Sequence, residues 1–139
     1  GVAEDERGLT VAQMSGATGV TAHTLRYYER AELIRPVARN SGNQRRYSPA
    51  DVEWVKFLLR LRETGMAIAQ MREYAILREQ GPATTEPRLR LLEAHHAALR
   101  EQIARMRTHE KALTAKITTY RDDLATLEAH HQDGTNDDN

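Results

Sequence analysis

The second half of the chain carries an apolar repeat, and this repeat is the strongest constraint on the fold. Twelve positions follow one another at alternating steps of three and four residues, and ten of them are apolar or aromatic. The run has no glycine or proline and spans more than five heptads, which is typical of a coiled coil. The positions are Leu89, Leu92, His96, Leu99, Ile103, Met106, Glu110, Leu113, Ile117, Tyr120, Leu124 and Leu127.

A helix with this repeat needs a cover for the side formed by these twelve positions, which we call the seam. A helix of about 40 residues is roughly 60 Å long, and the preceding domain of about 70 residues is too small to cover it. We therefore expect a second copy of the chain to provide the cover, in a homodimer. His96 is interpreted as a polar residue that sets the register. Glu110 is expected to pair with Arg107, with Lys111 or with an arginine of the partner helix.

The first half of the chain carries signals for short helices instead. Thr10 and Thr21 are suitable N-cap residues, and they predict helices over 11–17 and from 22 to about 32. Glycines lie between the two segments, so the arrangement is typical of a helix-turn-helix. The apolar positions predicted to face the core are Val11, Met14, Leu25, Tyr28 and Leu33.

Two further helices are predicted after residue 48. Ser48, Pro49 and Asp51 supply a cap, a proline at the first helical position and an acid in the first turn. These signals predict a helix from 49 to about 64, and the apolar spacing predicts another over 68–79. The predicted core positions are Val52, Val55, Leu58, Leu59, Leu61, Ile68, Met71, Tyr74 or Ala75, and Leu77.

Basic and aromatic residues gather in two neighbouring segments, "TLRYYER" and "RNSGNQRRY". The second segment surrounds the turn-forming "NSGN" and predicts a small two-stranded hairpin over 37–47. Residues 20–62 contain nine basic and four acidic residues, a net charge of +5, although the whole chain is neutral. Such a local excess of positive charge points to a polyanionic partner.

A DNA duplex is a partner that fits both segments. The helix after Thr21 would enter the major groove, where arginine reads guanine edges or holds phosphate and tyrosine hydroxyls hold phosphate. The hairpin would be a wing along the phosphate backbone. Two alternatives are a core role for Tyr28, three residues after Leu25, and a solvated turn in place of the wing. The candidate DNA-binding residues are Thr21, His23, Thr24, Arg26, Tyr27, Tyr28, Arg39, Arg45, Arg46 and Tyr47.

Several other classes of function find no support in the sequence. The chain has no cysteine, so disulfides, thiol redox switches and cysteine-based zinc sites are excluded. The adjacent pairs His95-His96 and His130-His131 point apart on a helix, so no metal and no cofactor is expected. No phosphate loop or catalytic constellation is found, so we do not expect an enzyme. No membrane span or signal peptide is found, so the expected location is cytoplasmic.

These observations predict a mainly α fold with five divisions. Residues 1–8 are expected to be a disordered arm or an added remnant. Residues 9–80 would form a winged helix-turn-helix DNA-binding domain with a small two-stranded β wing. A linker at 81–87 would lead to a coiled-coil dimerisation helix over 88–129, and 130–139 would be a flexible tail.

The motifs in this order resemble the MerR family of bacterial transcription regulators. The resemblance rests on "LTVAQMSGATGVTAHTLRYYERAELIRP", on "RNSGNQRRYSPADVEWVKFLLRLRETGMAI", and on the long heptad helix that follows. It implies two long helices packed antiparallel, with paired residue numbers that sum to about 216, as in Leu99 with Ile117. It also implies binding to a pseudo-palindromic operator in an overlong promoter spacer. The dimer would distort this DNA for RNA polymerase, and an effector would switch the bound dimer from repression to activation.

The resemblance also assigns residues and marks departures. Arg26 and Tyr28 match the "RYYE" block of the recognition helix, and Arg45 and Tyr47 match the wing. The family wing often reads Gly-Tyr-Arg where this chain has Asn-Gln-Arg, so one aromatic phosphate contact is expected to be lost. His23 replaces a common basic residue, so its contact would weaken as pH rises and the imidazole loses its charge.

Members that sense metals or redox use cysteines, which this chain lacks, and multidrug-sensing members carry a large C-terminal domain. The resemblance therefore favours short regulators of aldehyde or general stress responses. An inducer would bind near Trp54, Tyr74 or Tyr120, although a core role is the simpler interpretation of these residues. Two other functions stay open: an architectural, excisionase-like DNA binder and a coiled-coil adaptor without nucleic acid.

Overall fold

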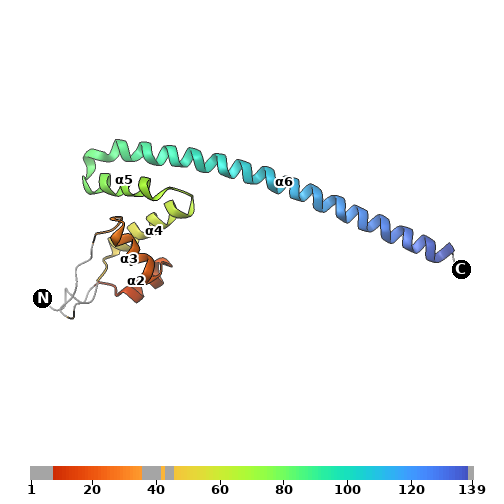
Figure 1. Cartoon of the computed structure of the whole chain (residues 1–139), viewed down its shortest axis with the longest axis horizontal. Helices are drawn as coiled ribbons and strands as arrows, with labels where there is room; N and C mark the ends of the chain where they lie inside the picture. Colours follow the sequence, from red (N-terminus) through yellow and green to blue (C-terminus); the bar gives the residue numbers. More distant parts are fainter. Residues whose placement is uncertain (1–7, 36–41, 43–45, 138–139) are drawn as a thin grey trace. The chain divides into compact units, whose positions relative to one another are not determined.

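The computed structural model of the chain describes residues 8–35, 42 and 46–137, with side chains to 133. It is mainly helical, as predicted (Figure 1). The chain divides into an N-terminal unit, Gly1–His96, and a C-terminal unit, Ala97–Asn139. The helices are α2 (Val11–Thr18), α3 (Ala22–Arg30), α4 (Pro49–Glu63), α5 (Ile68–Glu79), the 3-10 helix η1 (Pro82–Thr84) and α6 (Thr85–Asp137).

The helix starts follow the capping signals of the sequence. The Thr10 hydroxyl accepts a hydrogen bond from the Gln13 backbone N–H at 3.1 Å, and the Gln13 side chain accepts one from the Thr10 N–H at 2.9 Å. Ser48 and Asp51 form the same reciprocal pair at the start of α4. Thr21 caps α3 through the N–H of Thr24 at 3.1 Å. These bonds satisfy N–H groups that a helix leaves without internal partners.

Helices α3 and α4 end in the same type of turn. In each, an N–H group donates to a carbonyl five positions earlier at 2.9 Å, across a residue in the left-handed region. After α4 this residue is Gly65, with φ 93, which costs no Cβ clash. After α3 it is Glu32, with φ 62, and an L-residue there carries backbone strain. The predicted end of this helix near 32 was therefore two residues late.

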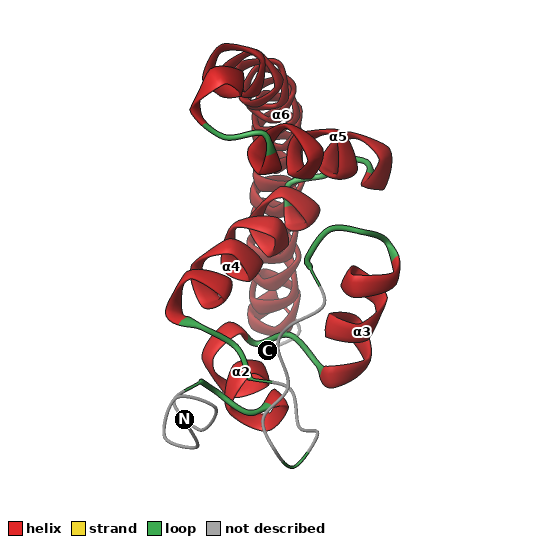
Figure 2. Ribbon diagram, turned by 90° about the vertical axis from the view of Figure 1, so that its left-hand side faces the viewer, coloured by secondary structure: helices red, strands yellow, loops and turns green. Residues whose placement is uncertain are grey.

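The core of the N-terminal unit lies between these short helices. Figure 2 shows the described residues of this unit as helices joined by loops. Leu59, Val11 and Ile68 pack against the core while only half-buried. Leu91 and Leu92, in the first turns of α6, also pack against it. The predicted positions that are buried are Met14, Leu25, Tyr28, Leu33, Val52, Val55, Leu58, Leu61, Met71, Tyr74 and Ala75.

Trp54 joins α4 to the segment after α3 and to α5. Its indole N–H donates to the Leu33 carbonyl at 2.9 Å, so the one polar atom of the ring has a partner although the residue is buried. Tyr74 stacks on the ring with centroids 5.9 Å apart. The Arg78 guanidinium lies 4.1 Å from the ring centroid, within cation–π range. The core role of Trp54 and Tyr74 is therefore supported.

The segment before α2 pairs with the segment before α4. Leu9 and Tyr47 exchange two backbone hydrogen bonds of 2.7 and 2.8 Å in an antiparallel bridge. In the described residues this is an isolated bridge and no longer strand is found. Most of the hairpin predicted over 37–47 lies outside the described residues, as does most of the arm predicted at 1–8.

The segment predicted as a linker at 81–87 contains regular structure. The 3-10 helix begins at Pro82, and α6 begins at Thr85, three residues before the predicted start. Thr84 is buried, and its hydroxyl lies within hydrogen-bond distance of the Leu77 and Gly81 carbonyls. Helix α6 continues to Asp137, beyond the predicted end at 129, so the backbone of the segment predicted as a tail is helical to that residue.

Candidate nucleic-acid interface

Helix α3 has one buried side and one exposed side. Leu25 and Tyr28 lie in the core and fix the rotation of the helix about its axis. His23 and Arg26 are exposed, and Tyr27 is 37% exposed. The exposed side therefore presents the residue types that bind DNA phosphates and base edges.

The N-terminal turn of α3 completes this exposed side. Thr21 is exposed and donates its hydroxyl to the hydroxyl of Thr24 at 3.0 Å. Thr24 is half-buried, so it offers less surface to a ligand than Thr21. Arg30, in the last turn of α3, is also exposed. Arg30 lies in the basic segment 20–62 but is not among the predicted DNA-binding residues.

Two residues predicted to contact DNA have their rings in the core. Tyr28 is 2% exposed and Tyr47 is 1% exposed. Burial raises the pKa of the Tyr28 hydroxyl, and the positive charge of Arg62 partly opposes the rise. The core alternative for Tyr28 is therefore supported, and the surface role predicted for Tyr47 is corrected. Arg62 is a nearby exposed cation and is not among the predicted DNA-binding residues.

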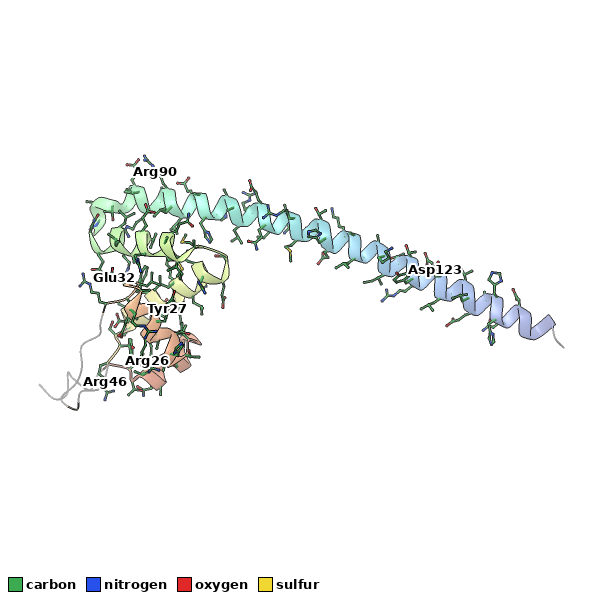
Figure 3. The ribbon with its side chains drawn as sticks, in the orientation of Figure 1. Arg26, Tyr27, Glu32, Arg46, Arg90 and Asp123 are labelled. Carbon is green, nitrogen blue, oxygen red and sulfur yellow. The ribbon has the colours of Figure 1, made fainter. Side chains whose placement is uncertain are left out.

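Arg46 is held at the base of the predicted wing. Its guanidinium Nη1 donates to the Gly8 carbonyl at 3.1 Å, and its side chain is half-buried. A Cβ at Gly8 would lie 2.8 Å from the Cβ of Arg46, so this close approach requires glycine. In Figure 3, Arg26 and Arg46 both lie at the lower end of the N-terminal unit. Arg39 and Arg45 lie outside the described residues.

Most of the predicted dimer interface is exposed in the single chain. Eight seam residues are between 41% and 65% exposed. Leu92 and Leu99 are half-buried, and Leu92 contacts the core of the N-terminal unit. His96 is exposed. The eight are Leu89, Ile103, Met106, Leu113, Ile117, Tyr120, Leu124 and Leu127.

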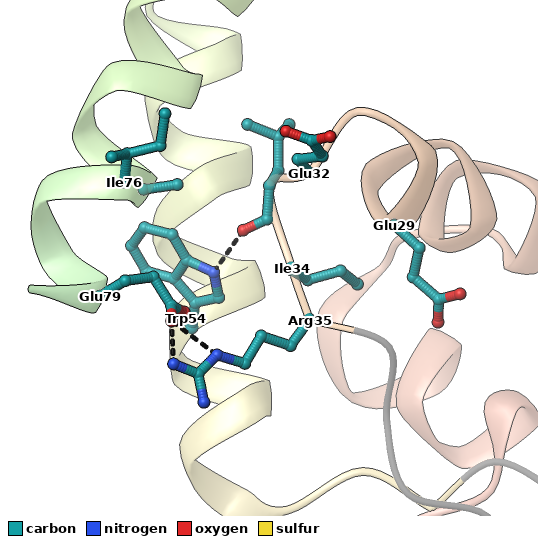
Figure 4. A pocket seen from close by; sticks show the side chains of 9 residues that line it. Glu29, Glu32, Ile34, Arg35, Trp54, Ile76 and Glu79 are labelled. Atoms are coloured by element: carbon teal, nitrogen blue, oxygen red, sulfur yellow. Dashed lines mark hydrogen bonds and ion pairs between the residues drawn. The ribbon is translucent and has the colours of Figure 1, made fainter.

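A cavity of about 270 Å³ opens beside Trp54 (Figure 4). Arg35 donates to the Glu79 carboxylate at its edge, with a distance of 2.6 Å from Nε. This hydrogen bond and the charge of Glu79 raise the pKa of the Arg35 guanidinium. The cavity is lined by Glu29, Glu32, Leu33, Ile34, Arg35, Trp54, Ala75, Ile76 and Glu79.

The described residues contain neither a metal site nor a membrane-spanning helix. Across 8–35 and 46–137, no three His, Asp or Glu side chains gather as a metal site would require. In the same part of the chain, no helix combines the length and the apolar character that crossing a membrane needs. The exposed side of α3 and the seam are thus the surfaces that the sequence and the structure both single out.

Comparison with known proteins adds a second line of observation. Residues 9–75 match the profile of the MerR HTH family regulatory proteins, and residues 52–116 match a second profile, MerR, DNA binding. An uncharacterized HTH-type transcriptional regulator of Haemophilus influenzae is 30% identical over 112 residues, which cover 81% of this chain and 83% of that protein. The regulator AdhR of Bacillus subtilis is 39% identical over 84 residues, and this chain spans 60% of its length.

Two crystal structures are similar to the whole fold. A MerR family transcriptional regulator from Listeria monocytogenes has a TM-score of 0.85 and 30% identity, with coverage of 94% of this chain and 99% of that one. HiNmlR, a MerR family regulator that lacks the sensor domain and was solved bound to promoter DNA, has a TM-score of 0.76 and 30% identity. The second match covers 85% of this chain and 94% of that one.

Proposed function

The chain belongs to the MerR family of transcriptional regulators, and from this premise we propose that it acts as a homodimer on promoter DNA. The dimer binds a pseudo-palindromic operator and distorts the duplex, so that RNA polymerase is affected through the DNA. The relatives are transcriptional regulators and not enzymes, which agrees with the absence of catalytic motifs in the sequence. HiNmlR, solved with promoter DNA, supports the DNA-binding part of the proposal.

The observation that carries the proposal is the two-sided character of α3. The buried side chains Leu25 and Tyr28 leave Arg26 and Tyr27 facing solvent next to the capped N-terminus of the helix. A helix N-terminus carries partial positive charge and free N–H groups, which favour phosphate. We assign Arg26 to base edges and phosphate, and we assign Thr21, His23, Thr24 and Tyr27 to positioning contacts with the backbone.

The predicted wing supplies further phosphate contacts in this proposal. Arg39, Arg45 and Arg46 are close in sequence, and their charges repel one another unless a polyanion neutralises them. Arg46 is tied to the Gly8 carbonyl, so it also supports the base of this segment. Because several phosphates are neutralised, the affinity for DNA falls steeply as salt rises.

In this proposal, the seam is the surface that binds the second copy of the chain. Its eight exposed apolar residues cannot all remain in water without cost, and a second α6 offers an identical apolar side. A symmetric dimer presents two α3 helices to one duplex, with half-sites one helical turn apart or a multiple of that spacing. The proposed dimer therefore explains why a pseudo-palindrome is the expected operator.

The test is the substitution Arg26→Ala, measured by fluorescence anisotropy on operator DNA from the region beside the protein's own gene. We expect a loss of about 1–3 kcal/mol on the operator, because a base-reading contact is removed. The loss on random duplex of equal length should be much smaller. Arg105→Ala, at an exposed position of α6, is the matched control and should leave both affinities unchanged.

Equal losses of affinity for operator and for random DNA would show that Arg26 does not read base edges. A footprint on the same DNA separates a promoter regulator from an architectural binder, because only the first requires a site between the −35 and −10 elements. Absence of binding to any genomic fragment would favour the coiled-coil adaptor.

A further inference from the structure

We propose that Arg107 and Glu110 form a four-charge cluster at the two-fold axis of the dimer, and that this cluster fixes the antiparallel orientation and register of the two α6 helices. The inference rests on the proposed homodimer. Glu110 is the one carboxylate among the twelve seam positions. Both residues are exposed in the single chain, on a helix with no break from Thr85 to Asp137.

The apolar residues alone favour one antiparallel register. In an antiparallel coiled coil, the first position of each heptad faces the fourth position of the partner, so the numbers of facing residues have a constant sum. A sum of 216 joins Leu89 to Leu127 of the partner subunit and gives every seam residue a facing seam residue. A shift by one heptad to 209 or 223 leaves Leu124 and Leu127, or Leu89 and Leu92, without one.

In this register the charged residues meet across the axis. Glu110 faces Met106 of the partner subunit. Arg107 of the partner subunit follows Met106, so it lies at nearly the same height as Glu110 along the axis of the coiled coil. Glu110 and Arg107 of one chain are three residues apart, so they also lie on one face of their own helix. The two-fold axis thus brings the two Arg107 guanidinium groups beside each other, with one Glu110 carboxylate on the outer side of each.

Charges farther along α6 favour the same register. At a sum of 216, Glu93 lies beside Arg121 of the partner subunit, and symmetry repeats this pair of opposite charges. A shift to 209 brings Arg100 beside Arg107 of the partner subunit instead. A shift to 223 brings Arg100 beside Arg121 of the partner subunit and Glu93 beside Glu128 of the partner subunit. At a sum of 216 the same spacing gives one like-charge pair, Arg107 beside Arg107 of the partner subunit, whereas by symmetry the shift to 209 gives two like-charge pairs and the shift to 223 gives four. The larger number of like-charge neighbours suppresses the shifted pairings.

Parallel packing is disfavoured by the seam itself. In a parallel pair each seam residue faces its own copy, so Glu110 would face the Glu110 carboxylate of the partner subunit. Two carboxylates in an apolar seam repel each other and lose hydration, with no cation between them. Antiparallel packing replaces this contact with the apolar Met106 of the partner subunit and adds two cations beside it.

The first experiment reverses one charge at a time and measures dimer dissociation by sedimentation equilibrium. Glu110→Arg gathers four cations at the axis and Arg107→Glu gathers four anions, so each variant should dissociate at least about tenfold more readily. An equimolar mixture of the two variants again gathers two cations and two anions at the axis and should form heterodimers with nearly native affinity or tighter. Arg105→Glu, which faces away from the seam, is the control and should change nothing.

Native affinity of both single variants would overturn the inference. A mixture no tighter than the separate variants would also overturn it, because the charges would then act only within each chain.

The second experiment uses the absence of native cysteines to measure the register directly. Chains with Ile103→Cys and chains with Leu113→Cys should form a disulfide when mixed under mild oxidation, and neither should cross-link to itself. Self-cross-linking of either variant would show parallel packing and would overturn the proposal. Cross-linking of Ile103→Cys to Met106→Cys or to Tyr120→Cys would show a shifted register and would overturn it as well.

The failure of this inference and the failure of the proposed function have different signatures. Two results overturn only the role of Arg107 and Glu110. One is a dimer with a different register, and the other is a dimer whose dissociation does not respond to charge reversal at these two residues. A native chain that remains monomeric at micromolar concentration and binds no operator overturns the proposed homodimer, and the inference with it.

Discussion

The N-terminal unit and the C-terminal part of α6 use the same kinds of apolar residue in opposite ways. In the N-terminal unit, short helices turn back on one another and bury residues such as Leu58 and Met71 completely. Along 97–133, where side chains are described, none is buried. The difference lies in the chain reversals and not in the residue types, because a helix without a turn cannot cover itself. The N-terminal unit closes its own core, whereas the apolar side of α6 stays unburied along 97–133 in the single chain.

The largest expected effect comes from placing charges in the apolar seam of α6. The double substitution Ile103→Asp with Leu113→Asp places four charges in the proposed interface of a dimer. We expect monomers in light scattering and no measurable operator binding, because the two half-sites are then no longer bound together. The N-terminal unit should remain folded, since neither residue belongs to its core.

Thr108→Asp with Ala115→Asp is the matched control for this substitution, because both positions face away from the seam. This control should remain dimeric. A dimer that survives the double substitution at Ile103 and Leu113 would show that the seam is not the interface.

The second prediction concerns the core of the N-terminal unit. Leu58 is 0% exposed, so Leu58→Ala should lower the free energy of unfolding by about 2–5 kcal/mol through a cavity that the helices cannot fill. Urea denaturation followed by tryptophan fluorescence measures the loss. Ile76→Ala, at a position 49% exposed on α5, is the control and should cost less than about 1 kcal/mol. Similar losses for both would contradict the assigned core.

The smallest predicted effect concerns the left-handed residues that follow α3 and α4. Glu32→Gly should raise the free energy of unfolding by up to about 1 kcal/mol, because glycine relieves the left-handed strain at φ 62. Gly65→Ala, at the equivalent position after α4, should lower it by a similar amount. Both are read from urea denaturation, and neither should alter association through α6. A loss of stability in Glu32→Gly would show that strain is not the dominant effect at this turn.

The parts of the fold that were predictable from the sequence depend on local interactions. The caps at Thr10, Thr21 and Ser48 act within three residues, so the starts of α2, α3 and α4 match their predictions. Apolar spacing located Met14 and Leu58 in the core for the same reason, because a helix repeats its faces at short intervals.

The parts that were not predictable depend on contacts between distant segments or on unusual backbone. The pairing of Leu9 with Tyr47 joins residues far apart in sequence, and nothing near Leu9 signals it. A left-handed residue is expected to be glycine or asparagine, so Glu32 gave no sign of the turn after α3. The exposed Arg26 and the buried Tyr28 lie in one sequence motif, and only the packing of α3 shows which of them faces solvent and which faces the core.

The packing of Trp54 gives the protein a built-in optical reporter. It is the only tryptophan of the chain, and it lies in the N-terminal unit, in contact with Tyr74 and the Arg78 guanidinium. Its emission wavelength will follow the hydration of that site. Tryptophan fluorescence can therefore follow the melting of the N-terminal unit without an added label.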